Sequence, residues 1–123
     1  MIIKNFTPHV INIIDESSVI SKPEIRKLVS ETENPKIIMS IPSDGMLSVN
    51  FEMQDGEPIN GIPVRIKKRV GIEYIPTDCD IAIVSALYAS ASDDKRCHTV
   101  IDPVFNVEGK TVIGCLAIGK VES

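Results

Sequence analysis

The chain has 123 residues and an apolar fraction of 43%, which fits one small globular domain over residues 1–123 and excludes a disordered chain. Its net charge of −4 argues against a protein that coats a nucleic-acid polymer. No apolar run reaches the roughly 20 residues that span a bilayer, no signal peptide is apparent, and three irregularly spaced cysteines are typical of a reducing cytoplasm.

Short runs rich in isoleucine and valine predict a sheet, because β-branched side chains favour extended backbone. The expected strands cover residues 10–14, 37–41, 47–53, 62–75, 80–84, 100–105 and 112–119. Apolar and polar side chains alternate over 47–53, which indicates a strand with one buried face. The run 112–119 is apolar throughout, so we expect it to be buried on both faces.

Two short helices are expected between these strands. Pro23 suits the first turn of a helix over residues 24–31, and small residues predict another over 85–91. A turn is expected at residues 42–45, where glycine supplies a positive φ, and a hairpin turn at 107–110. The predicted fold class is therefore α+β, a mainly antiparallel sheet with one or two short helices in a single small domain.

Proline also shapes one expected strand. Asp102 precedes Pro103, and the residue before proline avoids the α region. We therefore expect an extended step at Asp102.

The basic run Arg65-Ile66-Lys67-Lys68-Arg69 holds four of the thirteen cationic side chains. Residues two apart on a strand lie about 6.6 Å from each other on one face. Arg65, Lys67 and Arg69 could thus converge on an anion the size of a pyrophosphate-linked nucleotide. Lys68 interrupts the apolar face, which predicts a bulge or turn near it. The alternative is a solvated edge strand whose lysines discourage pairing with other chains.

Three residues of the C-terminal half are further candidates. Arg96 follows the second expected helix and is either an anion clamp or a plain surface residue. Phe105 could stack on adenine while Asn106 reads a base or ribose edge, and the alternative places Phe105 in the core.

Support for catalysis or metal binding is thin. Cys97 and His98 are neighbours, but consecutive side chains of a strand point to opposite faces, so they could not act on each other. Cys79, Cys97 and Cys115 stand too far apart for a zinc motif and are expected to be small buried hydrophobes. No glycine-rich phosphate loop occurs. We expect no catalytic residue, metal or cofactor.

Six short motifs carry a family resemblance. They are Thr7-Pro8-His9-Val10-Ile11, Pro42-Ser43-Asp44-Gly45, Gly61-Ile62-Pro63-Val64, Ile83-Val84-Ser85, Arg96 with Pro103, and Val112-Ile113-Gly114-Cys115. In this order, over most of its length, the chain resembles a family of small phage and prophage proteins, the first Thoeris anti-defence family.

The resemblance implies a phage-encoded sponge. Such proteins bind and sequester the cyclic ADP-ribose isomers that bacterial TIR enzymes make as infection signals, and they leave the ligand intact. Related members also capture other cyclic nucleotides, and the family forms dimer-based hexamers with pockets between protomers. For this chain the resemblance implies no nucleic-acid or membrane partner and a place in the cytoplasm of the infected or lysogenic host.

The resemblance also assigns residue roles. Arg96 matches the family's arginine after the small helix, which implies a phosphate contact. Arg69 falls where relatives tend to carry an aromatic residue, and Phe105 where many carry an arginine, so stacking and charge pairing are expected to have exchanged places. Asp80 and Asn106 are expected near the same cleft. The ligand-binding set is Arg65, Lys67, Arg69, Asp80, Arg96, Phe105 and Asn106.

Two other functions stay open at this stage. One is a hydrolase of a nucleotide derivative that uses Cys97 or His98. The other is a small phage structural or host-interaction protein that binds no nucleotide and presents its basic strand to a partner.

Overall fold

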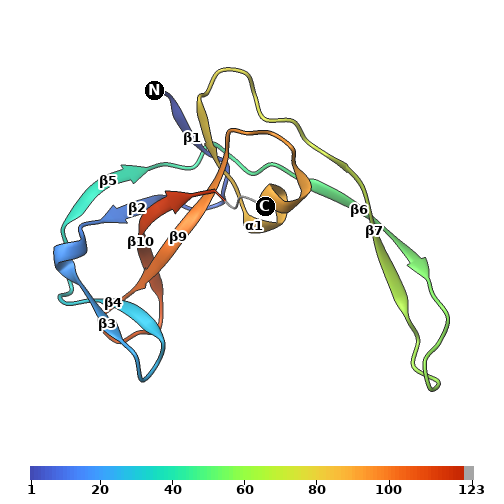
Figure 1. The fold of residues 1–123 in the computed structure, drawn as a ribbon, viewed down its shortest axis with the longest axis horizontal. Coiled ribbons are helices and arrows are strands. Elements are labelled where there is room, and N and C mark those ends of the chain that lie inside the picture. Colours follow the sequence, from blue (N-terminus) through green and yellow to red (C-terminus); the bar gives the residue numbers. More distant parts are fainter. Residues whose placement is uncertain (121–123) are drawn as a thin grey trace.

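The computed structural model describes residues 1–120 and divides the chain into a body and an arm (Figure 1). The body is an eight-stranded sheet with one short helix, and the arm is a separate two-stranded sheet that extends away from it. We use "arm" for residues 49–72, which comprise β6 (Val49–Asp55), β7 (Arg65–Ile72) and their connecting loop.

The body strands are short and come from both halves of the chain. They are β1 (Ile3–Asn5), β2 (Ile11–Ile14), β3 (Val19–Lys22), β4 (Lys27–Ser30), β5 (Ile37–Ile41), β8 (Ile81–Ile83), β9 (Cys97–Phe105) and β10 (Val112–Gly119). A 3₁₀ turn, η1, covers Glu16–Ser18, and the helix α1 covers Ala86–Ala91. No helix within residues 1–120 is long and apolar enough to cross a membrane.

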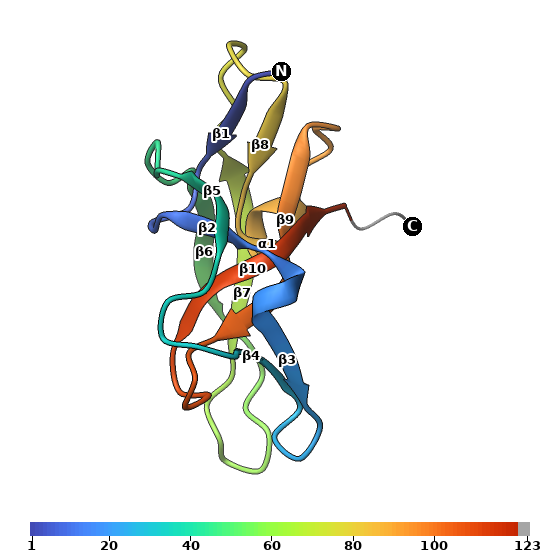
Figure 2. The ribbon, with the colours of Figure 1, turned by 90° about the vertical axis from the view of Figure 1, so that its left-hand side faces the viewer.

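The body sheet is mixed, which corrects the expectation of a mainly antiparallel sheet. Its main strand order is β1-β8-β9-β10-β2-β5, and β4 joins the β3–β4 hairpin to β9. Among the described strands, four pairs are parallel (β1–β8, β8–β9, β10–β2 and β4–β9) and four are antiparallel. Figure 2 shows β1 beside β8, although the arm and several strands separate them in sequence.

The helix expected over residues 24–31 is wrong, because this segment forms the second half of the β3–β4 hairpin. Strand β3 pairs antiparallel with β4, with Lys22 opposite Lys27. Residues 23–26 form the turn, and Arg26 has a φ of +55°, which an α-helix does not allow. Val29 is fully buried, so the apolar residues of β4 serve the sheet.

The second expected helix is confirmed as α1. The side chain of Ser85 caps it by accepting a hydrogen bond of 3.1 Å from the backbone N–H of Tyr88. Tyr88 is 1% exposed, and its hydroxyl donates a hydrogen bond to the carbonyl of Glu73. This bond joins α1 to the segment that follows the arm.

The strand expected at 112–119 is confirmed as β10, but it is not buried on both faces. Cys115 is its one fully buried residue, while Val112 is 53% exposed. A Cβ on Gly114 would lie 2.4 Å from the backbone oxygen of Asn12, so only glycine lets β10 approach β2 this closely.

Two apolar clusters form the core of the body. One gathers Phe6, Ile75, Cys79, Ala82, Val84 and Tyr88 under α1, and the other gathers Ile11, Ile41, Ile83 and Cys115 in the sheet. The partly buried Leu47 and Val49 pack on the first cluster. Beyond Val49 the predicted buried face of 47–53 is wrong, because the strand leaves the body and Met53 is exposed.

Three local predictions concern backbone conformation. The turn expected at 42–45 is wrong, because Ser43 forms a parallel bridge with Asn5, although Gly45 has the expected positive φ of +101°. The extended step at Asp102 is wrong, since its φ is +53°, a region that aspartate enters more easily than most residues. The register of the arm shifts between Asn50 and Phe51, opposite Gly71 and Arg69. The expected irregularity near Lys68 therefore lies at Val70.

Candidate functional site

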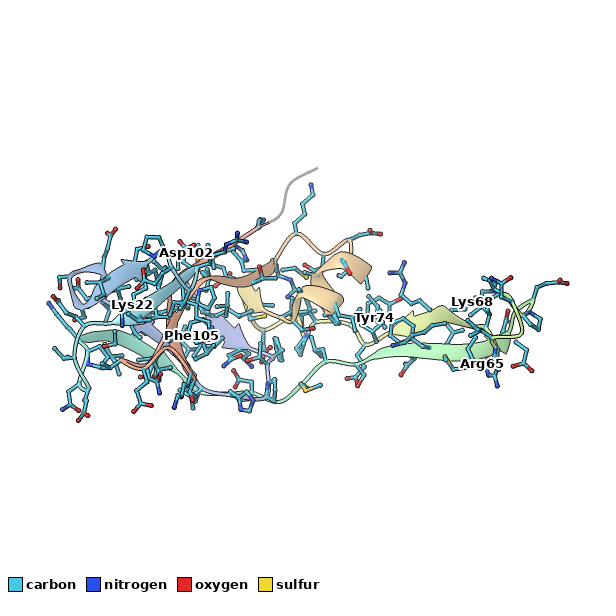
Figure 3. The ribbon with its side chains drawn as sticks, turned by 90° about the horizontal axis from the view of Figure 1, so that it is seen from below. Lys22, Arg65, Lys68, Tyr74, Asp102 and Phe105 are labelled. Atoms are coloured by element: carbon cyan, nitrogen blue, oxygen red, sulfur yellow. The ribbon has the colours of Figure 1, made fainter. Side chains whose placement is uncertain are left out.

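The predicted cations Arg65, Lys67 and Arg69 share one face of the arm. All three belong to β7, where alternate side chains point the same way. Arg69 pairs across the strands with Phe51, so this ring lies on the same face. Figure 3 labels Arg65 on the arm, far from the body. We call these four residues the cationic face.

Within the cationic face, two of the cations keep their charge available. The Nζ atom of Lys67 lies 4.2 Å from the centroid of the Phe51 ring, a cation–π contact. Arg65 forms an ion pair, with its Nε 3.2 Å from Oδ1 of Asp55. No carboxylate within residues 1–120 lies at ion-pair distance from Lys67 or Arg69. An anion that met this face would find two unpaired cations beside an aromatic ring.

Sequence reasoning missed Phe51 as a site residue. The alternation over 47–53 placed this side chain in a buried face, whereas the arm leaves it half-buried beside Lys67. The signal that could have found it is the hairpin register, which sets Phe51 opposite Arg69.

Arg96 lies in the body, where its guanidinium is occupied by the protein itself. It donates hydrogen bonds to the carbonyls of Ile75 (3.2 Å), Pro76 (2.6 Å) and Cys79 (3.2 Å). It also donates from Nε and Nη2 to the carboxylate of Asp94, at 3.1 and 2.8 Å. All the nitrogens of the guanidinium therefore have partners within the chain, and this arrangement leaves no free fork for a phosphate.

This arrangement also perturbs both ionisable groups. The hydrogen bond from Arg96, opposed by partial burial, holds the pKa of the Asp94 carboxyl below its ordinary value. The same bond raises the pKa of Arg96. Both shifts favour the charged pair, so Arg96 acts as a clamp between the loop after α1 and residues 75–79.

Asp80 has a structural partner at the start of β1. Its carboxylate accepts a hydrogen bond of 2.7 Å from the backbone N–H of Ile2. The backbone N–H of Asp80 in turn donates to the carbonyl of Ile2 at 2.8 Å. These bonds fix the edge pair β1–β8.

Phe105 and Asn106 lie at the β9–β10 turn. The Nζ atom of Lys27 is 4.4 Å from the centroid of the half-buried Phe105 ring. The side-chain oxygen of Asn106 accepts hydrogen bonds from the backbone N–H of Lys110 (2.9 Å) and Thr111 (3.4 Å). Asn106 thus closes the turn predicted at 107–110, which is confirmed.

The predicted ligand-binding residues therefore occupy separate places in one copy of the chain. Figure 3 shows Arg65 near the tip of the arm and Phe105 within the body. Arg96 and Asp80 are each hydrogen-bonded within the body. One copy brings together only the three cations of β7.

A cavity of about 710 Å³ opens elsewhere, between α1 and the ends of β9 and β10. Its polar lining includes Ser90, Ser92, Lys95, Thr99 and Lys120. None of the predicted ligand-binding residues lines this cavity within the described chain. Its volume is in the range of small-molecule sites.

The cavity also touches Cys97. Burial raises the pKa of the Cys97 thiol, which disfavours the thiolate needed for nucleophilic attack. The ring nitrogen Nδ1 of the adjacent His98 lies 2.8 Å from the carbonyl oxygen of Arg96, so this His98 nitrogen is not free to activate a thiol. Over residues 1–120, no group of three or more histidine, cysteine and acidic side chains is placed to hold a metal.

Comparisons of the chain with models of protein families, with curated proteins and with solved structures gave no match.

Proposed function

We propose that this protein is a phage anti-defence sponge, which binds cyclic ADP-ribose isomers made by TIR enzymes and keeps them intact, thereby blocking Thoeris signalling. We extend the proposal to other cyclic nucleotides as additional ligands. The observation that carries it is the cationic face, where Lys67 and Arg69 have no acidic partner among the described residues and flank the Phe51 ring.

The chemistry of the cationic face suits such a ligand. A cyclic ADP-ribose carries a pyrophosphate, which attracts closely spaced cations, and a purine, which stacks on an aromatic ring. An arginine can bind two phosphate oxygens at once through its planar guanidinium. The acidic charge of the whole chain disfavours nucleic acids as competitors for the same cations.

Sequestration needs binding alone, and the local chemistry of the thiol supports a non-enzymatic role. The raised pKa of Cys97 and the engaged Nδ1 of His98 weaken the hydrolase alternative. We therefore assign no catalytic residue.

The proposed site is completed between copies of the chain. One arm offers an open surface with cations on one side, whereas tight capture of a small molecule needs an enclosed pocket. We propose a homo-oligomer, a dimer-based hexamer by family resemblance, in the cytoplasm of the infected or lysogenic host. Phe105 and Asn106 of another copy are the candidates for the opposite wall of this site, across from the cationic face.

Calorimetric titration with cyclic ADP-ribose isomers tests the proposal. We expect binding, and recovery of the unchanged ligand after heat denaturation of the complex. Arg69→Ala should weaken binding about tenfold or more, since it removes a hydrogen bond to a charged group. Lys4→Ala, a cation of β1 paired with Asp78, is the matched control and should bind normally.

Other results would point elsewhere. Full affinity in Arg69→Ala together with loss in Lys95→Ala would move the site to the 710 Å³ cavity. A degraded ligand would establish an enzyme.

The second candidate is a phage structural or host-interaction protein that binds no nucleotide. The observation that favours it is the apolar surface of the arm, where Met53 and Ile62 are exposed. The absence of any heat signal with all the cyclic nucleotides tested would select this candidate.

A further inference from the structure

A single copy of the chain exposes more surface than a compact protein of its mass. Its accessible surface is 8507 Å² for a mass of 13.5 kDa. A compact monomer of this mass exposes about 6500 Å², so the excess is about 2000 Å². A standard protein–protein interface buries about 1600 Å² in total, or about 800 Å² on each partner, so the excess on one copy is more than one such interface would cover.

Much of the apolar part of this surface lies on the arm. Its exposed apolar residues are Met53, Ile59, Ile62, Ile66 and Val70. None of residues 49–72 is buried. An isolated two-stranded hairpin is at best marginally stable in water, and it needs a further strand or a covering surface. The arm therefore needs a partner, and the body of the same copy does not supply one.

A second uncovered apolar surface is the edge strand β5. It stands at the end of the sheet order, with β2 on one side and no described strand on the other. Ile37, Ile38 and Met39 are 48%, 61% and 51% exposed. An edge of this kind presents unpaired backbone groups that another strand can extend.

Charge makes the two surfaces complementary. Four cations and three acidic residues give the arm a net charge of +1, so the rest of the chain carries −5. The loop before β5 holds the exposed Glu31 and Glu33, while the cations of the arm lie along β7. In one copy the arm and β5 lie on opposite sides of the molecule (Figure 1), so an arm meets a β5 edge only in a second copy.

We propose that the arm of one copy docks on the β5 edge of a second copy of this chain. Docking would pair a strand of the arm with β5, cover the apolar residues of both surfaces and bring Lys68, which alternates along β7 with the cationic face, near Glu33. This contact goes beyond the proposed function and stands whether or not a nucleotide binds.

Sedimentation velocity of the full chain over a range of concentrations tests the contact. We expect a dimer or larger assembly whose dissociation constant rises at least tenfold in Ile66→Glu, on the arm, and in Ile38→Glu, on β5. Leu87→Glu is the matched control, since Leu87 is 54% exposed on α1 and lies on neither surface. Circular dichroism of each variant verifies that the fold is retained.

A charge exchange keeps the test independent of folding defects. Lys68→Glu and Glu33→Lys should each weaken assembly, because each places two like charges at the contact. The chain that carries both substitutions should assemble normally, because the charges are again opposite. A folding defect caused by one substitution would not be repaired by the other, since the two residues lie far apart in one copy. A monomer at all concentrations would overturn the proposal. So would an assembly that responds to the arm variants but not to the β5 variants. Nucleotide titration of the same samples is a separate readout, so failure of docking and failure of ligand binding are told apart.

Discussion

The body and the arm of this chain use the same kinds of residue for different ends. In the body, apolar side chains form two clusters, and β-branched residues such as Ile83 and Val104 are fully buried. In the arm, Ile66 and Val70 stand half exposed on a free-standing hairpin. Hydrophobic sequence alone therefore does not tell a core strand from an interface strand.

The arginines show the same contrast. Arg96 lies beside residues 75–79, where no strand uses the carbonyl groups, and these carbonyls accept its hydrogen bonds. Arg69 lies on a strand whose carbonyls serve the β6–β7 ladder. Its guanidinium therefore faces solvent or a partner. The supply of free backbone acceptors, more than the residue type, separates a structural cation from one that can bind a ligand.

The largest expected effect compares buried and exposed isoleucines. Ile83→Ala should lower the free energy of unfolding by about 3 kcal/mol, because it leaves a cavity in the core. Ile66→Ala on the arm should lower it by less than about 0.5 kcal/mol in the dissociated chain. Urea denaturation at fixed low protein concentration measures both. Equal losses would erase the distinction between body and arm.

The next effect compares the two arginines. Arg96→Ala should lower the melting temperature by roughly 5–10 °C, since three carbonyls and a carboxylate lose their donor. Arg69→Ala should leave it within about 2 °C, as for other surface substitutions. Differential scanning fluorimetry gives both values. A stable Arg96→Ala protein would return this residue to the list of ligand contacts.

A smaller effect is the response to acid. The hydrogen bond from Arg96 lowers the pKa of Asp94 below its ordinary value of 3.8, so the folded state gains stability at higher pH. This gain is complete above that value and is lost as pH falls through the folded pKa. Between pH 5 and pH 2, the melting temperature should fall less steeply with decreasing pH in Arg96→Ala than in the unchanged protein. The same dependence of melting temperature on pH in both proteins would mean that the Arg96–Asp94 pair does not contribute to folding stability.

The smallest effect concerns the thiol beside the cavity. Burial raises the pKa of Cys97, so its thiolate is scarce near neutral pH. Iodoacetamide should label Cys97 several-fold more slowly at pH 8 than a free cysteine in a short peptide, as measured by mass spectrometry of the digested protein. Rapid labelling would restore the thiol enzyme as a candidate.

Sequence reasoning identified many elements but not their arrangement. Alternation and β-branched runs correctly placed β5, β8, β10 and the small-residue helix α1. The segment after Pro23 misled the prediction, since a proline that starts a helix equally starts the turn of a hairpin. The parallel pairs were not predictable, because strands of three or four residues carry too little pattern to specify distant partners.

The candidate site was predictable in part. The basic run was read directly from the sequence, and β7 brings its three alternate cations to one face, as expected. The carbonyls that engage Arg96 could not be foreseen, because no residue pattern tells which backbone oxygens of an irregular segment turn inward. Phe51 was missed because its partner depends on the hairpin register.

The position of β10 between β9 and β2 has a consequence for the order in which the protein folds. Strand β2 is made early and can pair with β5 soon afterwards, yet its other neighbour in the sheet is made about one hundred residues later. During synthesis the edge of β2 that faces β10 stays unpaired until residues 112–119 leave the ribosome. Distant pairings of this kind slow folding and prolong the exposure of apolar segments. We therefore expect the nascent chain to depend on chaperones more than its small size suggests.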